Sequence, residues 1–506
     1  MSYAEIFSRA SVGVDAPLVS IEVHLANGIP SFSLVGLPET TVRESRERVR
    51  SAIIQSGFEF PAKRIIINLA PADLPKSGGR FDLAIAIGVL AASGQIILPN
   101  DEDILSHYEF LGELSLAGDI RPISACLPAI VASEHANRIV FIAQQNQKEA
   151  SLCKSAKVIC SQHLNDVVAM LSHPENSVFL KPSDSGKRVK STLDMSDIIG
   201  QSQAKRALVI AAAGNHNVLF VGPPGTGKSM LAQRIGTLLP PLNDEQALQS
   251  ATIHSVKGSY LEQVDWFQRP FRSPHHSASL NALVGGGSHP KPGEISLAHN
   301  GVLFLDEFPE FGRKVIDALR EPLETGDIQI SRANAKVVFP ARFQLVAAMN
   351  PSPTGDVNDG RSAPDQVLRY LNRISGPLLD RIELQVEVNR QQLQVNDARS
   401  SEPTSKELRS QVVSARTIQL SRQGCLNSQL SVGDLENHCV LTNTNNTFFL
   451  KALDSIGGSH RAMHRILKVA RTIADLEGAP SIERAHLAEA MGYRALETLI
   501  NQLSSC

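Results

Sequence analysis

Hydrophobic and polar positions in residues 1–172 follow two periods, one typical of strands and one typical of helices. Short apolar runs predict strands at Leu18–Val23, Phe32–Val35, Ile65–Leu69, Phe110–Leu114 and Ile139–Ala143. Helical spacing predicts an amphipathic helix over Thr41–Ile54, and the apolar, alanine-rich Leu83–Ser93 predicts a buried helix. The mixture indicates an α+β or α/β domain over residues 1–172.

The next segment, 173–193, has neither period and contains Pro, Ser, Asp and Lys, as linkers do. Beyond it, apolar runs at Val218–Val221, Gly301–Leu305 and Phe343–Met349 alternate with helical patterns such as Ser202–Ala213. This alternation predicts an α/β domain over residues 194–390. Helical patterns at 405–425, Ser459–Leu476 and 481–503 predict an α-helical domain over residues 391–506.

Composition limits the classes of protein to consider. Of the 506 residues, 42% are hydrophobic and 20% are charged, which is typical of globular domains. The formal net charge is −2, so nucleic-acid binding would depend on local basic patches. The six cysteines form no Cys-x-x-Cys pair, and no apolar run approaches the length of a membrane span. These features favour a cytoplasmic protein with neither a disulfide framework nor a zinc site.

A glycine-rich segment between a predicted strand and a predicted helix carries the first candidate chemistry. It follows Val218–Val221 and reads Gly222-Pro223-Pro224-Gly225-Thr226-Gly227-Lys228-Ser229. The backbone N–H groups of such a loop, together with the N-terminus of the following helix, attract a polyphosphate. The Lys228 ammonium would reach the terminal phosphates, and the Ser229 hydroxyl would bind Mg²⁺. The segment therefore predicts a nucleoside triphosphate site.

A buried strand that ends in two carboxylates supplies candidate residues for hydrolysis. Gly301–Leu305 is followed directly by Asp306 and Glu307. We expect Asp306 to bind Mg²⁺ and Glu307 to be the general base that orients and deprotonates the attacking water. An acidic strand end in solvent is the simpler alternative, and the phosphate loop argues against it.

These motifs resemble those of AAA+ ATPases. The resemblance implies that Gly200 and Gln201 lie against the adenine base, and the glycine would permit close backbone approach. It also implies that Asn350, at the end of the strand Phe343–Met349, is the sensor asparagine that positions the lytic water.

Two arginines match AAA+ positions that act on the γ-phosphate. Arg381 lies just before an apolar strand and would cross to the site of a neighbouring subunit, with Arg369 and Arg373 as alternatives. Arg461, near the start of the helix Ser459–Leu476, would be the second sensor of the lid. Arg465 lies one turn further along the same face and is the alternative to Arg461.

Two insertions narrow the resemblance. Residues 236–300 separate the helix after the phosphate loop from the strand before Asp306, and Glu324–Phe339 has the alternation of a β-hairpin. With the motifs above, these insertions are similar to the magnesium-chelatase-like branch of AAA+ ATPases, which is related to replicative MCM helicases. Many relatives carry a cysteine-rich loop after the asparagine. Here Pro351–Asp356 contains no cysteine, so no metal role is assigned to it.

The N-terminal domain resembles the proteolytic domain of Lon-type proteases, through the segment Pro71–Asp82 and the following Gly112–Ile120. A serine nucleophile there needs a lysine base. The Lon pattern puts Arg80 or Phe81 at the serine position and places the lysine near Leu127. Lys76 and Ser77 are the alternative pair, although adjacent side chains normally point apart. We therefore expect an inactive, structural or DNA-contacting domain.

The whole chain resembles the ComM/YifB family of competence-associated ATPases. The resemblance implies an α/β fold with an AAA+ P-loop core on a parallel sheet, an α-helical lid, and a separate N-terminal α+β Lon-protease-like domain. It also implies an ATP-driven hexameric DNA helicase or translocase that promotes branch migration while transforming DNA is integrated in natural competence. ATP and Mg²⁺ would be the cofactors. The partners would be further copies in a homohexamer, single-stranded and branched or forked DNA, and recombination proteins.

Basic residues in the two insertions are candidate contacts to DNA phosphates, namely Lys291, Arg332 and Lys336. Few aromatic residues flank them, so base stacking is expected to be minor. The alternative is that these side chains lie on solvent-facing turns.

Two other functions are compatible with the core motifs. One is a magnesium-chelatase-type motor for metal insertion into a porphyrin, although chelatase ATPase subunits begin with the nucleotide-binding core. The other is a non-motor, ATP-gated scaffold with little turnover. His275 and His276 also suggest zinc, but the sequence shows no carboxylate that would orient the imidazoles, so packing or DNA contact is favoured.

Overall fold

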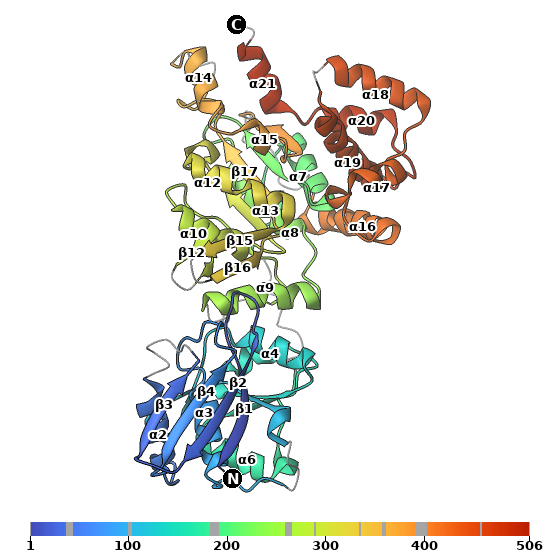
Figure 1. The fold of residues 1–506 in the computed structure, drawn as a ribbon. Coiled ribbons are helices and arrows are strands. Elements are labelled where there is room, and N and C mark those ends of the chain that lie inside the picture. The colour runs from blue at the N-terminus through green and yellow to red at the C-terminus, as the bar shows by residue number, and fades with distance from the viewer. Residues whose placement is uncertain are drawn as a thin grey trace.

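The computed structural model describes residues 2–36, 44–99, 104–182, 192–258, 266–287, 290–332, 335–356, 361–390, 402–455 and 458–504. Figure 1 shows an N-terminal domain at the lower end of the molecule, an α/β core above it, and a helical region beside the core. This architecture confirms the predicted fold class, with its parallel-sheet core and its separate N-terminal domain.

The N-terminal domain is built on a seven-stranded mixed sheet in the order β3-β4-β2-β1-β5-β8-β9. Strand β2 pairs antiparallel with both β1 and β4, and the remaining pairs are parallel. The strands are β1 (Tyr3–Arg9), β2 (Leu18–Ala26), β3 (Ser31–Val35), β4 (Arg64–Ala70), β5 (Tyr108–Phe110), β8 (Ile139–Ala143) and β9 (Val158–Ser161). A short hairpin is formed by β6 (Glu113–Leu114) and β7 (Ile120–Arg121).

The prediction of one strand over Phe110–Leu114 is wrong, because the chain leaves the sheet after Phe110. The Gly112 N–H donates to the carbonyl of Arg80 at 3.2 Å, and the Leu83 N–H donates to the carbonyl of Gly112 at 3.1 Å. These bonds tie Gly112 to the loop before a helix instead of to a neighbouring strand.

Helices cover this sheet, and the most buried of them is α3. The helices are α2 (Ser45–Gln55), α3 (Asp82–Ala92), α4 (Cys126–His135), α5 (Gln147–Ala150) and α6 (Leu164–Ser172). Every residue of α3 is buried, as its apolar composition predicts. A Cβ on Gly88 would lie 2.6 Å from Cγ2 of Val23, so glycine permits the close approach of α3 to β2. Residues 41–43 of the predicted helix Thr41–Ile54 lie outside the described part.

The core contains a five-stranded sheet in the order β11-β14-β17-β10-β18, and all its pairs are parallel. The strands are β10 (Val218–Val221), β11 (Phe271–Arg272), β14 (Val302–Leu305), β17 (Gln344–Met349) and β18 (Leu384–Glu387). Every residue of β10, β14 and β17 is buried, which explains their continuous apolar runs. The carboxyl ends of these strands meet at one edge of the sheet.

Helices and two small hairpins complete the core. The helices are α7 (Ser202–Gly214), α8 (Lys228–Leu238), α9 (Asp244–Lys257), α10 (Leu280–Val284), α11 (Glu294–Leu297), α12 (Arg313–Ala318), α13 (Arg320–Thr325), α14 (Pro364–Leu371) and α15 (Gly376–Leu379). One hairpin joins β12 (Gly285–Gly286) to β13 (Lys291–Pro292), and the other joins β15 (Asp327–Arg332) to β16 (Ala335–Pro340). A Cβ on Gly285 would lie 3.1 Å from Cδ1 of Ile330, so the two hairpins are neighbours.

The described residues after 401 are mainly helical. The helices are α16 (Ser405–Gln423), α17 (Val432–His438), α18 (Asn443–Ser455), α19 (His460–Leu476), α20 (Arg484–Met491) and α21 (Ala495–Ser504). The last helix, α21, returns to the core and packs against β18 and α14, and Figure 1 shows it next to α14.

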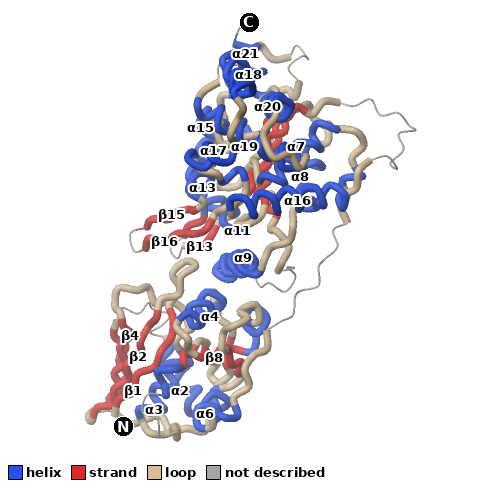
Figure 2. Tube along the Cα trace, turned by 90° about the vertical axis from the view of Figure 1, so that its right-hand side faces the viewer, coloured by secondary structure: helices blue, strands red, loops and turns tan. Residues whose placement is uncertain are grey.

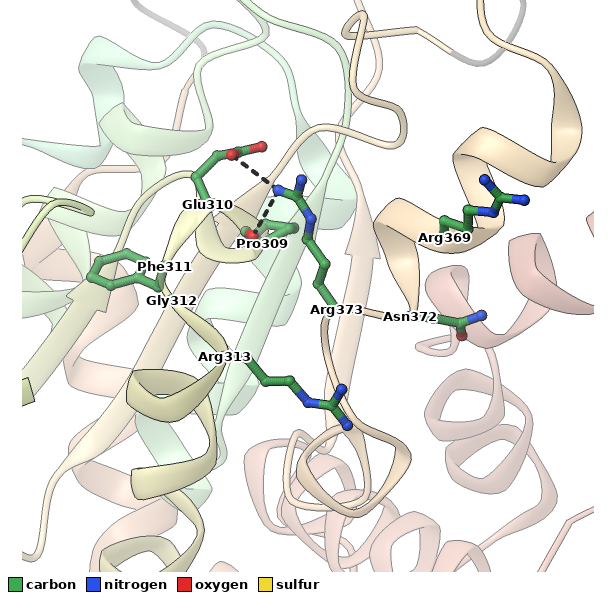
Figure 3. Close-up of a pocket in the computed structure, with 8 residues that line it drawn as sticks. All are labelled: Pro309, Glu310, Phe311, Gly312, Arg313, Arg369, Asn372 and Arg373. Atoms are coloured by element: carbon green, nitrogen blue, oxygen red, sulfur yellow. Dashed lines mark hydrogen bonds and ion pairs between the residues drawn. The ribbon is translucent and has the colours of Figure 1, made fainter.

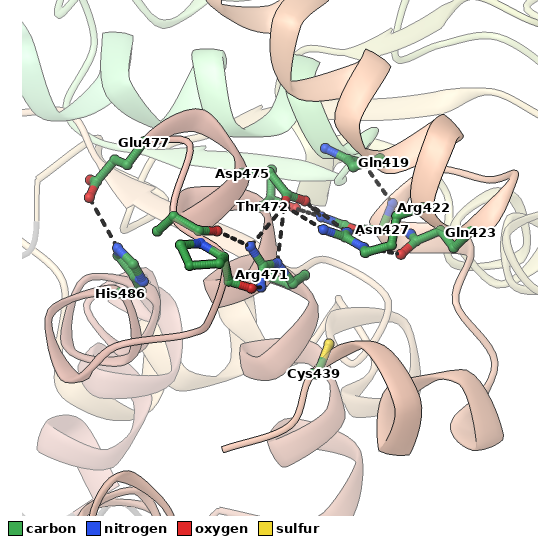
Figure 4. Close-up of polar contacts among 12 residues, drawn as sticks. Gln419, Arg422, Gln423, Asn427, Cys439, Arg471, Thr472, Asp475, Glu477 and His486 are labelled. Atoms are coloured by element: carbon green, nitrogen blue, oxygen red, sulfur yellow. Dashed lines mark hydrogen bonds and ion pairs between the residues drawn. The ribbon is translucent and has the colours of Figure 1, made fainter. Parts of the chain in front are cut away.

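A buried ion-pair network stabilises the helical region (Figure 4). Asp475 of α19 is fully buried and lies 2.6 Å from Arg422 of α16 and 2.9 Å from Arg471. The side-chain amide of Asn427 donates to the same carboxylate at 2.8 Å. Two guanidinium groups and an amide therefore compensate the buried charge.

The N-terminal domain contacts the core through α9 and the β15–β16 hairpin, and Figure 2 shows α9 between α4 and the rest of the core. The Ala125 N–H donates to the carbonyl of Ser255 on α9 at 3.1 Å. In the turn between β1 and β2, a Cβ on Gly13 would lie 2.2 Å from Cγ1 of Val337. Gly13 also has a φ of +62°, so both its conformation and its contact with the hairpin favour glycine.

Candidate nucleotide site and its neighbours

The phosphate loop connects β10 to α8 and lies against the ends of two neighbouring strands. The Gly222 N–H donates to the carbonyl of Met349 on β17 at 3.2 Å. A Cβ on Gly222 would lie 2.1 Å from the carbonyl oxygen of Val388, which follows β18. Gly225 and Gly227 have φ values of +79° and +89°, a region that glycine adopts readily. The glycine spacing therefore serves both the turn and the close packing of the loop.

The Lys228 ammonium lies among oxygen atoms at the centre of the site. It donates to the carbonyls of Gly222 and Pro223, each at 2.7 Å, and to Oδ1 of Asn350 at 3.2 Å. Burial lowers the pKa of Lys228, and the Asp306 carboxylate opposes this effect. A phosphate oxygen would satisfy the same donor with a charge-assisted bond, so the donor set fits a triphosphate.

Ser229 and Asp306 are brought together at the carboxyl ends of β10 and β14. The Ser229 hydroxyl donates to Oδ2 of Asp306 at 2.6 Å, and Oδ1 accepts from the Glu307 N–H at 2.9 Å. Mg²⁺ prefers hydroxyl, carboxylate and phosphate oxygens, so this pair fits the predicted metal position. When bound, Mg²⁺ would neutralise the charge that develops on the phosphate oxygens.

Glu307, the predicted general base, has a φ of +52° and an exposed side chain. Its Oε2 lies 2.8 Å from Nδ1 of His276. His276 follows β11, which pairs with β14, so the sheet brings the two residues together. Sequence reasoning considered His276 for packing, DNA contact or zinc, and missed this pairing. The apolar Phe271, in the short strand β11 before the histidines, is the feature of the sequence that could have indicated this pairing.

The His275 and His276 rings are 4.1 Å apart. No group of three or more His, Cys, Asp or Glu side chains in the described ranges is arranged to hold a metal ion.

The residues expected at the adenine base lie beside the phosphate loop. The Gly200 N–H donates to Oε1 of Glu402 at 2.7 Å. The Gln201 side-chain amide donates to the carbonyl of Asn389 at 2.8 Å and to that of Thr226 at 3.4 Å. The sequence did not single out Glu402, which also pairs with Lys205. Gly200 and Gln201 thus connect the phosphate loop to the segments that flank residues 391–401.

The three arginines considered for the trans role lie in different surroundings. Figure 3 shows Arg369 and Arg373 at a cavity of about 410 Å³ that is lined by residues 309–313, Arg369, Asn372 and Arg373. No phosphate-loop residue lines this cavity, so we do not regard it as the nucleotide pocket. Arg373 pairs with Glu310 at 3.1 Å. Arg381 pairs with Glu324 and donates to the carbonyl of Pro377.

The two lid arginines lie in different surroundings. Arg461 is exposed in the first turn of α19, whose N-terminus is capped by Ser459. Arg465 donates to Oδ1 of Asp380 at 2.9 Å and to the carbonyl of Leu379 at 3.2 Å. Arg461 therefore stays the candidate sensor, and Arg465 is engaged with the segment that precedes Arg381.

The candidate DNA contacts lie on the two hairpins. Lys291 is exposed on β13 and Lys336 is exposed on β16. The backbone of Arg332 ends β15, and its side chain lies outside the described part.

In the Lon-like segment, the expected serine position is occupied by Arg80, whose side chain reaches the loop just before Leu127. Arg80 is buried and donates to the carbonyls of Ser124 and Ala125, next to Leu127. Burial lowers the pKa of Arg80 to about 10. Lys76 is fully buried, and its ammonium donates to the carbonyls of Gly36, Pro71 and Leu74. These three bonds direct the ammonium to backbone carbonyls, whereas a lysine base would have to meet the serine hydroxyl.

Comparison with known proteins identifies the family. Competence protein ComM of Haemophilus influenzae is 54% identical over 512 residues, which cover 100% of both chains. The chain belongs to the ComM/YifB family. YifB of Escherichia coli is 49% identical over 507 residues, covering 99% of each chain. The magnesium-chelatase 38 kDa subunit of Rhodobacter capsulatus is 26% identical over 336 residues, covering 61% of this chain and 88% of that subunit.

Three family descriptions match successive parts of this ComM/YifB chain. Residues 194–396 match "Magnesium chelatase, subunit ChlI", residues 21–146 match "Subunit ChlI of Mg-chelatase", and residues 402–494 match "Magnesium chelatase, subunit ChlI C-terminal". The core is therefore of the magnesium-chelatase-like AAA+ ATPase type, a type that uses a nucleotide and Mg²⁺. The structure describes no helix long and apolar enough to cross a membrane.

Proposed function

We propose that the chain is an ATP-driven DNA helicase or translocase that works as a homohexamer and promotes branch migration during integration of transforming DNA. The observation that carries the proposal is that one core domain contains both the converging nucleotide-site residues and two neighbouring hairpins with exposed lysines. Lys228, Ser229, Asp306 and Asn350 converge at one edge of the core sheet. The name of the Haemophilus relative supports the link to competence.

ATP and Mg²⁺ are the proposed cofactors, held by the phosphate loop, Ser229 and Asp306. Glu307 orients and deprotonates the attacking water, and Asn350 positions it. Arg381 of one subunit stabilises charge on the γ-phosphate held by the next subunit, and Arg461 acts from the lid of the subunit that holds the nucleotide. The site is therefore complete only in an oligomer.

On the DNA side, the hairpins β12–β13 and β15–β16 follow the phosphates of a single-stranded, branched or forked substrate. Lys291, Arg332 and Lys336 are the proposed contacts. Such contacts add affinity without reading sequence, and the affinity decreases with salt. Replacing Lys336 with alanine should weaken binding and lower the slope of log affinity against log salt by about one.

The proposal is tested by measuring ATP turnover with and without forked DNA, together with displacement of a labelled strand. We expect DNA to stimulate turnover and the Lys228→Ala variant to be inactive in both assays. Glu307→Gln should bind ATP and DNA without displacing the strand. An assembled oligomer whose turnover is indifferent to DNA would contradict the proposal.

The same variants separate the alternatives. A non-motor scaffold would keep its function in Glu307→Gln, because it would need nucleotide binding without hydrolysis. The similarity to the Rhodobacter chelatase subunit favours metal insertion as the second candidate function. A coupled chelation assay with the partner subunits of a chelatase would detect it.

A further inference from the structure

The lid helix α19 is joined to the segment that carries the proposed trans arginine. Arg465 of α19 donates through both terminal nitrogens, to Oδ1 of Asp380 at 2.9 Å and to the carbonyl of Leu379 at 3.2 Å. The Arg465 side chain is 14% exposed, so solvent screens this pair less than it screens a surface pair. Asp380 and Leu379 directly precede Arg381 in the chain.

The backbone around Arg381 is held from both sides. Leu379 is buried, and the Arg381 carbonyl accepts from the side-chain amide of Asn217 at 2.8 Å. Asn217 precedes β10, the strand that leads into the phosphate loop. The Arg381 guanidinium itself pairs with Glu324, in the helix just before the β15–β16 hairpin. Arg465 therefore links the lid helix α19 to this segment, and its Nη2 also lies 3.6 Å from Glu497 of α21.

Arg461 and Arg465 are four residues apart on one helix, so they move together when α19 moves. Arg461 faces solvent in the first turn, where the proposed function places it on the nucleotide of its own subunit. A shift of α19 toward that nucleotide would be passed through Arg465 to Leu379 and Asp380. The position of Arg381 would then depend on the nucleotide state of the subunit that carries it.

We propose that Arg465 is a positioning residue that couples the lid of one subunit to the arginine presented to its neighbour. The inference rests on the proposed function, in which Arg381 acts in trans. Loss of Arg465 removes the two hydrogen bonds from α19 to Leu379 and Asp380, so Arg381 samples positions from which it does not reach the neighbouring phosphate. The defect should therefore appear in the site of the neighbour and not in the site of the altered subunit.

Mixed oligomers test this directly. Glu307→Gln subunits bind ATP without hydrolysing it but keep Arg381, whereas Arg381→Ala subunits keep the hydrolytic residues but present no arginine. The turnover of an equimolar mixture is compared with that of each variant alone. Any excess comes from sites in Arg381→Ala subunits that receive Arg381 from a Glu307→Gln neighbour. Arg465→Ala is then added to one kind of subunit at a time.

We expect Arg465→Ala in the Glu307→Gln subunits to lower the turnover of the mixture about tenfold, as loss of a positioned transition-state contact does. The same change in the Arg381→Ala subunits should alter turnover by less than about twofold, because those subunits present no arginine to position. Binding of a fluorescent ATP analogue and the melting temperature, measured on each variant alone, check that the subunits fold and bind nucleotide.

The inference would be overturned by any of three outcomes. Arg465→Ala could lower turnover equally in both arrangements, lower it only when placed in the Arg381→Ala subunits, or lower it in neither. If the starting mixture shows no recovered turnover, Arg381 does not act in trans and the inference fails at its first step. The DNA stimulation of the unaltered protein is measured separately. It therefore tests the translocase proposal whatever happens in the mixtures.

Discussion

Nδ1 of His276 lies 2.8 Å from Oε2 of Glu307, the residue we predict to activate water. The histidine precedes the β12–β13 hairpin in the chain, and the glutamate follows the strand that pairs with β11. A hydrogen bond from the imidazole stabilises the charged carboxylate, and this interaction opposes the transfer of a proton from water to Glu307.

Replacing His276 with alanine should therefore raise ATP turnover in the absence of DNA. A hydrogen bond to a charged group contributes about 1.5–3 kcal/mol, so we expect an increase of about ten- to a hundredfold. The matched control is His275→Ala, since the neighbouring ring is exposed and its Nδ1 contacts Ser277 instead. A fall in turnover for His276→Ala would show that the histidine orients Glu307 productively.

Asn350 contacts the Lys228 ammonium at 3.2 Å, and this predicts different effects for two substitutions. Asn350→Ala should lower kcat about a hundredfold, because one preorganised polar group is lost, while nucleotide affinity changes little. Asn350→Asp should weaken ATP binding, because its carboxylate would pair with Lys228 and repel the γ-phosphate. Titration with a fluorescent ATP analogue and steady-state kinetics separate the two effects. Equal affinities for the two variants would count against this account.

Asp475 is the fully buried acceptor of the helical region, and its removal should be costly. Asp475→Ala leaves two guanidinium groups without their shared carboxylate, for which we expect a loss of about 3–5 kcal/mol in the free energy of unfolding. Asp454→Ala, on the exposed side of α18, should change the same quantity by less than about 0.5 kcal/mol. Urea denaturation followed by circular dichroism measures both. Similar effects would mean that the network contributes little.

We expect the contact of Gly13 with the β15–β16 hairpin to hold the N-terminal domain against that hairpin. Gly13→Ala would place a methyl group 2.2 Å from Cγ1 of Val337, which is buried, so the turn and the hairpin must separate. Gly57→Ala is a matched control, because Gly57 also has a positive φ but has no atom within 4 Å of its added Cβ. Hydrogen exchange of the hairpin amides should accelerate in Gly13→Ala only. Unchanged exchange in that variant would argue that the contact does not hold the hairpin.

Two buried histidines predict a loss of stability in mild acid. Burial, reinforced by Lys468, lowers the pKa of His216 to about 3, and burial, reinforced by Arg342, lowers the pKa of His299 to about 4. The unfolded chain binds protons at these histidines with a pKa of about 6.5, so it binds more protons than the folded protein just below that pH. The stabilisation is therefore present above about pH 6.5 and is lost as the pH falls toward 4.

At about pH 5.5 each histidine should cost about 1.4 kcal/mol relative to neutral pH. The measurement is the urea midpoint at the two pH values for the unaltered protein and for His216→Gln, which removes one titrating group. The pH-dependent loss should be smaller in the variant. If the variant and the unaltered protein lose the same stability between the two pH values, groups other than His216 cause the pH dependence.

Much of the fold follows from local patterns. The strand Val218–Val221, the glycine loop and the helix after it are contiguous, and the structure has them within a residue or two of the prediction. Ile139–Ala143 and the capped helix that starts after Ser459 were also predicted correctly, because their periods and flanking residues carry the information locally. The strand predicted over Phe110–Leu114 was wrong, since Gly112 bonds to the loop that carries Arg80 and no local pattern reveals that partner.

The sequence by itself determined which residues are suited to phosphate and Mg²⁺ chemistry, because Lys228, Ser229 and Asp306 stand in short motifs that include their own strand and turn. Only the tertiary structure decided which distant groups meet. It paired His276 with Glu307, joined Arg465 to Asp380 and set Gly13 against Val337. These contacts depend on the order of strands in a sheet and on how helices and domains pack. Hydrophobic periodicity specifies which face of an element is buried, but it does not specify what that face is buried against.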